Sequence, residues 1–276
     1  MGKLILCSGA RTTRPYGFAS TGIRVYSMEE LCYYLYHHVY YVEENMFSDS
    51  LIEWIRTELK LPERAEKLRQ LKQHKADIKS MVAVILCSTD YYSEYEIKEL
   101  LKLLDDIIGM PLIKRNCMKA NSFLKNGFYH EAADTYESVL NSPEAIKLTP
   151  KEYGDILHNL AITKVHLVGY KEAAELFREA YIRNHGEESL HQHLIALKLY
   201  GNEEDYRNRI SEYQVSEELQ NRISDYLEQV NQEVVQYKGI QELQSLKKLF
   251  VQGDRVTFYQ NAGELLDVWK SKARRG

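Results

Sequence analysis

Three groups of residues in this chain carry side chains that could take part in catalysis or metal binding. The first is a cysteine followed by arginines, Cys7, Arg11 and Arg14, which is the residue pair of a phosphatase loop. Such a loop surrounds a phosphate with backbone N–H groups and requires a fixed spacing. Three residues separate Cys7 from Arg11 and six separate it from Arg14. The required spacing lies between these values, so the sequence argues against phosphatase chemistry.

The other two groups are histidine pairs. His37 and His38 are adjacent, and His191 and His193 are alternate. Adjacent or alternate residues of one helix point to different faces, so neither pair is suited to chelate a metal ion. The phosphate-binding pattern GxxxxGK[ST] and the zinc pattern HExxH do not occur. We therefore predict no enzyme, no catalytic residue, no metal site and no cofactor.

The composition is that of an ordered globular protein. The 276 residues are 44% hydrophobic and 28% charged. A net charge of −4 provides no basic surface for nucleic acid, and the longest apolar run, 81–87, is too short to span a membrane. The four cysteines contain no CxxC pair, which favours buried thiols in a reducing compartment. We predict a cytoplasmic protein that binds neither nucleic acid nor membrane.

Two segments have the pattern of one helix–turn–helix unit. In each, two alanines are 12 positions apart, Ala120 and Ala132 in the first and Ala161 and Ala173 in the second. An aromatic residue follows four positions after the later alanine, at 136 and 177. Small residues let two helices approach closely, and the aromatic residues would fill the groove between neighbouring pairs.

Residues 111–184 resemble the tetratricopeptide repeat (TPR) family. The second unit matches the family pattern at Leu157, Leu160, Ala161, Ala173, Phe177 and Ala180. The first unit departs from it, with Asn116 and Lys119 where large residues are expected. The resemblance implies stacked helix pairs that form a surface for binding another protein.

The two units are not evenly spaced. Their alanines are 41 positions apart (161 − 120), whereas the family repeat is about 34 residues. We assign the excess to an enlarged loop at 142–154, which contains Pro143, Pro150 and Gly154. A third, weaker unit keeps the turn around Gly201 but lacks the small residues.

The regions on both sides of the repeats are also predicted to be helical. Capping boxes at Ser27–Glu30 and Ser93–Glu96 begin two helices of the N-terminal region. Short extended segments are expected at 4–7 and 22–26, with a loop at 11–17. From about residue 217, a long helix carries an apolar stripe formed by Leu219, Ile223, Tyr226, Val230, Val234 and Tyr237.

The predicted fold class is therefore all-α. A helical N-terminal domain (1–110) precedes a TPR-like superhelix (111–215) and capping helices (216–276). The stripe of the long helix either covers the last repeat or forms a homodimer contact.

The TPR resemblance also implies a binding site, because the first helix of each pair lines the concave surface in that family. The implied peptide- or partner-binding residues are Met118, Asn121, Leu124, Lys125, His158, Asn159, Ile162, His166, His191 and Gln192. One family subset grips a peptide carboxylate with Asn, Lys and Arg. Asn121 and Asn159 match its asparagines, but Cys117, Glu188 and Gln192 replace its cations, so apolar contacts and asparagine hydrogen bonds to a peptide backbone are expected instead.

Three functions remain open from the sequence. The leading one is a non-catalytic scaffold or adaptor whose partner is a protein or peptide. The second is a signalling regulator whose repeats sense a peptide. The third is an enzyme with a site in the unmatched N-terminal region, where 11–17 contributes the polar residues Thr12, Thr13, Arg14 and Tyr16.

Overall fold

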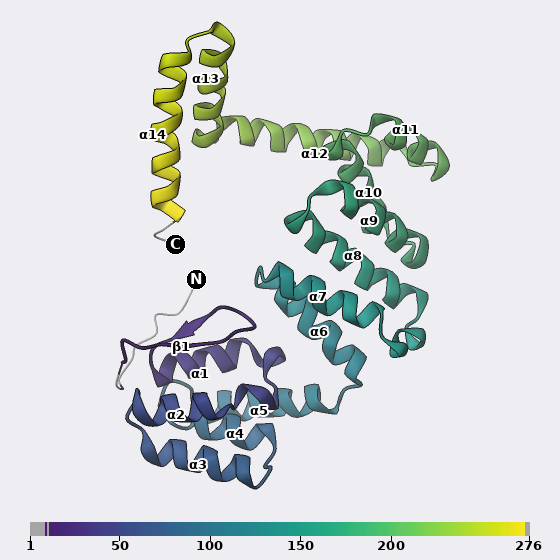
Figure 1. The fold of residues 1–276 in the computed structure, drawn as a ribbon. Helices are drawn as coiled ribbons and strands as arrows, with labels where there is room; N and C mark the ends of the chain where they lie inside the picture. Colours follow the sequence, from purple (N-terminus) through teal and green to yellow (C-terminus); the bar gives the residue numbers. More distant parts are fainter. Residues whose placement is uncertain (1–8, 10, 274–276) are drawn as a thin grey trace. The chain divides into compact units, whose positions relative to one another are not determined.

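Helices make up most of the computed structural model, which describes residue 9 and residues 11–273 (Figure 1). The described residues contain fourteen α-helices and three 3-10 helices, and their one sheet is a two-stranded hairpin. The all-α prediction is confirmed. The chain forms two units, 1–202 and 203–276. The expected extended segment at 4–7 and the Cys7 motif lie outside the described residues.

The first unit begins with β1 (Tyr16–Gly17) and β2 (Arg24–Val25), which pair in antiparallel register. β2 lies within the predicted extended segment, whereas β1 replaces the end of the loop expected at 11–17. The helices that follow are α1 (Met28–His37), η1 (Val39–Tyr41), η2 (Glu44–Met46), α2 (Asp49–Thr57), α3 (Pro62–Gln73), α4 (Ile78–Leu86) and α5 (Glu94–Gly109).

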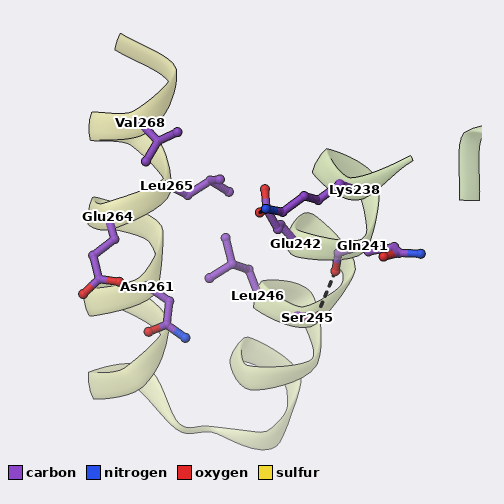
Figure 2. A pocket seen from close by; sticks show the side chains of 9 residues that line it. All are labelled: Lys238, Gln241, Glu242, Ser245, Leu246, Asn261, Glu264, Leu265 and Val268. Carbon is purple, nitrogen blue, oxygen red and sulfur yellow. Dashed lines mark hydrogen bonds and ion pairs between the residues drawn. The ribbon is translucent and has the colours of Figure 1, made fainter. Parts of the chain in front are cut away.

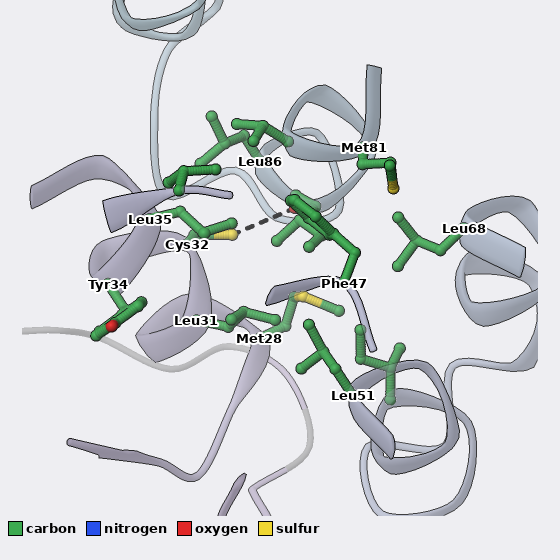
Figure 3. Packing of buried hydrophobic residues seen from close by; sticks show 14 of the residues in the cluster. Met28, Leu31, Cys32, Tyr34, Leu35, Phe47, Leu51, Leu68, Met81 and Leu86 are labelled. Atoms are coloured by element: carbon green, nitrogen blue, oxygen red, sulfur yellow. Dashed lines mark hydrogen bonds between the residues drawn. The ribbon is translucent and has the colours of Figure 1, made fainter. Parts of the chain in front are cut away.

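These elements enclose one hydrophobic core (Figure 3). Phe47 and Leu51 are each 1% exposed within it. The Cys32 thiol donates to the Ile85 carbonyl at 3.2 Å. The Trp54 indole N–H donates to the Arg14 carbonyl at 2.8 Å, which fixes the segment before β1. The cysteines are not uniformly buried as predicted, because Cys87 is exposed.

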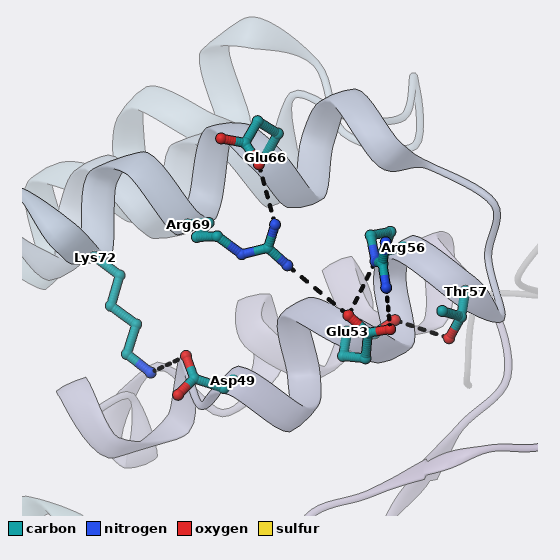
Figure 4. A network of polar contacts seen from close by, with 7 residues as sticks. All are labelled: Asp49, Glu53, Arg56, Thr57, Glu66, Arg69 and Lys72. Atoms are coloured by element: carbon teal, nitrogen blue, oxygen red, sulfur yellow. Dashed lines mark hydrogen bonds and ion pairs between the residues drawn. The ribbon is translucent and has the colours of Figure 1, made fainter.

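The outer surfaces of α2 and α3 are joined by charged side chains (Figure 4). Lys72 lies 2.7 Å from Asp49, and Arg69 contacts both Glu53 and Glu66. The Lys72 ammonium lowers the pKa of the Asp49 carboxyl. Such exposed pairs contribute little stability individually, so the apolar core beneath them determines the fold of this region.

Five further helices follow in the first unit. They are α6 (Leu112–Lys125), α7 (Tyr129–Leu140), α8 (Pro150–Leu167), α9 (Tyr170–Asn184) and α10 (Glu187–Tyr200). Each packs on the next one in sequence (Figure 1). The four alanines that define the repeat pattern, Ala120, Ala132, Ala161 and Ala173, are all 0% exposed, as the spacing predicts.

The loop expected at 142–154 is shorter than predicted. A 3-10 helix, η3 (Pro143–Lys147), occupies its first part, and α8 already begins at Pro150. Thr149 and Glu152 form a capping box there, and proline is favourable in a first helical turn. Gly154 therefore lies inside α8, where it is buried.

The second unit contains α11 (Glu203–Glu212), α12 (Glu217–Gln236), α13 (Lys238–Gln252) and α14 (Arg255–Ala273). Ser216 caps α12 through a bond from the Leu219 N–H, at the predicted start of the long helix. Gly253, at φ 82°, forms the turn between α13 and α14. The Asp254 carboxylate accepts from the Thr257 N–H and caps α14.

Replacing Gly154 by alanine should test the close approach of α8 and α9. A β-carbon at Gly154 would lie 2.8 Å from the Ala180 carbonyl oxygen and 2.8 Å from the Asn184 backbone nitrogen. Backbone atoms of a packed helix cannot easily retreat, so Gly154→Ala should lower the free energy of unfolding by about 1–3 kcal/mol. Chemical denaturation measures this change. The control is Gly109→Ala, where a β-carbon meets nothing within 4 Å; equal stability of the two variants would contradict the packing.

Candidate functional site

The candidate site is a groove between the N-terminal helices and α6. Its volume is about 600 Å³. Tyr33, His37, His38 and Tyr40 line it from α1 and η1, and Met118, Asn121, Ser122, Lys125 and Asn126 line it from α6 and its C-terminal cap. Three of the ten predicted site residues, Met118, Asn121 and Lys125, are among them.

Tyr41 holds the two sides of the groove together. Its ring stacks on Phe123 with centroids 4.2 Å apart, and its hydroxyl oxygen accepts from the Ser122 hydroxyl at 3.1 Å and from the Asn126 amide at 3.2 Å. Beside it, Lys119 forms an ion pair with Glu43. These contacts fix η1 against α6 and therefore set the width of the groove.

His38 lies at the wall of the groove with 9% of its surface exposed. Its ring stacks on Tyr41 at 5.3 Å. Its Nδ1 atom is buried and has no hydrogen-bond partner among the described residues. Burial, assisted by neighbouring His37, lowers the pKa of the His38 imidazole and so favours its neutral form.

Asn121 and Asn159 contact each other across α6 and α8. The Asn159 amide nitrogen donates to the Asn121 side-chain oxygen at 3.1 Å. The same oxygen accepts from the Tyr136 hydroxyl at 2.6 Å, and the Tyr136 side chain is 0% exposed. Asn121 itself is exposed. The asparagine pair is thus held by the buried Tyr136 hydroxyl, while Asn121 remains exposed.

The remaining predicted site residues are not brought to this groove. His166 stacks on Tyr129 with centroids 4.0 Å apart. His191 and Gln192 both lie against Glu188, at 3.9 and 2.8 Å. Leu124 packs against the core that surrounds Phe123. Ile162 is half-buried on α8.

His158 belongs to a polar cluster where α8, α9 and α10 meet. The Ser189 hydroxyl lies 3.0 Å from His158 Nδ1, and the Asn184 amide donates to both Ser189 Oγ and Asp155 Oδ1 at 3.0 Å. Burial lowers the pKa of the His158 imidazole, although the carboxylates of Glu188 and Asp155 oppose this shift. A serine beside a histidine is also the arrangement of a nucleophile and its base. However, Ser189 is 1% exposed, so the cluster joins three helices rather than presenting a nucleophile to a substrate.

Sequence reasoning missed the N-terminal wall of the groove. Tyr33, His37, His38 and Tyr40 lie in an aromatic segment, for which the sequence predicted a helix and, at His37 and His38, a pair poorly suited to bind a metal ion. The density of aromatic side chains in 33–41 was the available signal. Nothing in the local sequence indicates that this segment packs on α6.

A second cavity lies between α13 and α14, with a volume of about 530 Å³. Leu246 and Leu265 project toward each other across it, with Glu242 and Lys238 at one end (Figure 2). Only residues of these two helices line it, so the two helices are not closely packed along this part of their length.

Among the described residues, neither a metal cluster nor a membrane-spanning helix is found. No cluster of three or more histidine, cysteine, aspartate or glutamate side chains is arranged to hold a metal ion. Every described helix is too short or too polar to cross a lipid bilayer.

Compared with known protein families, with curated proteins and with solved structures, the chain matches none. The TPR resemblance of 111–184 therefore stays an interpretation of the sequence pattern.

The polar cluster predicts how stability depends on pH. Because burial places the pKa of folded His158 below its ordinary value of about 6.5, protons bind the unfolded chain more tightly. The contribution of His158 to the free energy of unfolding is then fully present above about pH 6.5. It is lost as the pH falls toward the pKa of His158 in the folded state. Denaturation midpoints at several pH values should show this loss, and His158→Gln should make the loss smaller. An unchanged profile for His158→Gln would refute the assignment.

Proposed function

We propose that this chain is a non-catalytic adaptor whose TPR-like helix pairs hold a peptide segment of a partner protein. The fully buried alanines of α6–α9 support a repeat architecture, since they allow each helix to approach its neighbour closely. We place the protein in the cytoplasm, where the Cys32 thiol, which donates to the Ile85 carbonyl, stays reduced.

The asparagine pair carries this proposal. The Asn121 side-chain oxygen is occupied by Tyr136 and Asn159. Its amide nitrogen has no partner among the described residues, and neither has the side-chain oxygen of Asn159. One donor and one acceptor therefore remain available on two helices that contact each other. A peptide unit offers the complementary carbonyl oxygen and N–H group.

The groove suits the side chains of such a peptide. Tyr33 and Tyr40 offer aromatic surface on one wall, and Met118 offers flexible apolar surface on the other. Aromatic residues and methionine are enriched at protein interfaces, and methionine adapts to varied partners. Asn121 lines this groove and also belongs to the asparagine pair, so one peptide could contact both.

Asn121→Asp separates binding from folding. An aspartate oxygen can still accept from Tyr136 and Asn159, but the outward-facing amide donor is lost. A peptide selected from a random library on the unaltered protein should bind Asn121→Asp more weakly by at least about 0.5–1.5 kcal/mol. Titration calorimetry measures the affinity, and thermal unfolding should be nearly unchanged.

Asn208→Asp is the matched control, because Asn208 is an exposed residue of α11 and the change in charge is the same. It should bind the peptide with unaltered affinity. The proposal would be abandoned if the library selects no peptide, or if Asn121→Asp binds the selected peptides as tightly as the unaltered protein.

A further inference from the structure

The groove between the N-terminal helices and α6 has a one-sided distribution of charge. Among the described residues that line it, none is an aspartate or a glutamate, and one, Lys125, is a lysine. Two histidines, His37 and His38, lie on the opposite wall. An anionic group in the groove would therefore meet a positive side chain and no opposing carboxylate among these residues.

Lys125 is available to a bound anion. Its side chain is exposed and makes no ion pair with a described residue. Lys119, earlier on the same helix, differs from it, because its ammonium pairs with Glu43. The last carbonyls of α6, those of 122–124, accept from the backbone N–H groups of 126–128, which weakens their attraction for the Lys125 ammonium.

Lys125 also lies on the side of α6 that carries the asparagine. Met118, Asn121 and Lys125 are three and four positions apart, which places them in one row on a helix, and all three line the groove. One helical turn separates Asn121 from Lys125, so their β-carbons are about 5–6 Å apart. A peptide residue whose backbone bonds to the Asn121 amide could therefore extend its side chain to the Lys125 ammonium.

His38 is a second polar group of the groove that is left without a partner. It is 9% exposed, and its ring makes no hydrogen bond to a described residue. The ring stacks on Tyr41, whose hydroxyl accepts from the amide of Asn126, and this brings His38 toward the Lys125 end of the groove. Burial lowers the pKa of the imidazole, and the neutral ring carries one N–H that can donate to an anion.

We propose that the groove takes an acidic side chain of the bound peptide, held by the Lys125 ammonium and the His38 imidazole. This inference rests on the proposed function, because it specifies which peptides the groove selects. The peptide backbone lies on Asn121, and the aspartate or glutamate side chain of the residue bound there enters the groove. Hydrogen bonds to a carboxylate are stronger than those between neutral groups, so the acid contributes specificity.

Matched peptides test this acidic position on the full chain. The peptides selected from the random library should share an aspartate or glutamate at one position. Replacing that residue by asparagine or glutamine in a synthetic peptide should weaken binding about threefold or more, and added salt should reduce the difference. Amidation of the peptide C-terminus should leave the affinity unchanged, because the carboxylate belongs to a side chain.

Lys125→Met tests the lysine in the same titrations. It should weaken the acidic peptide about as much as the amide replacement does, and it should leave the amide peptide unaffected, so that the two changes are not additive. His38→Phe keeps an aromatic ring against Tyr41 and should act in the same way. The matched control is Lys102→Met, at an exposed lysine of α5 outside the groove, which should bind both peptides with unaltered affinity.

Failure of this inference differs from failure of the proposed function. Selected peptides that bind but share no acidic position overturn the inference alone, and so does an acidic peptide that binds Lys125→Met or His38→Phe at full affinity. Loss of binding on amidation of the C-terminus shows that the groove takes a terminal carboxylate, which also overturns it. A library that selects no peptide overturns both.

Discussion

The close approach of consecutive helices is the constraint on which the rest of the first unit depends. Ala120, Ala132, Ala161 and Ala173 have no exposed surface, and Gly154 meets the backbone of α9 where any β-carbon would collide. Since these positions fix how α6 to α9 lie, they also fix the distance between Asn121 and Asn159. The polar pair is therefore a consequence of small apolar residues elsewhere on the same helices.

The groove depends on the N-terminal helices as well as on the helix pairs. Its α6 wall is part of the helix pairs, whereas its other wall belongs to the N-terminal helices. Tyr41 links the two walls by stacking and by hydrogen bonds. A buried hydroxyl that accepts from two donors orients both walls at once. The shape of the groove is thus set jointly by the N-terminal helices and by α6.

Local signals in the sequence predicted the helices well. The Ser93–Glu96 capping box and Pro62 in a first turn each act within a few residues of one helix. The alanine spacing joins two consecutive helices, so these signals are all present in short stretches of sequence. The groove could be predicted only in part, because its walls meet through long-range contacts; Tyr41 and Ser122 are 81 positions apart. His158 was assigned to the binding surface through the family pattern, but its ring lies against Ser189 of α10. Periodicity identifies the buried side of a helix but not which neighbour covers each position.

The two tryptophans of the chain are divided between its units and differ in environment. Trp54 is 7% exposed and donates its indole N–H to the Arg14 carbonyl, whereas Trp269 of α14 is 41% exposed. Indole fluorescence shifts to longer wavelength as water reaches the ring. Each unit consequently carries its own optical reporter, one blue-shifted and one red-shifted. Replacing either tryptophan by phenylalanine would leave a single emission that follows the melting of one unit, so the order in which the two units lose structure can be read without any added label.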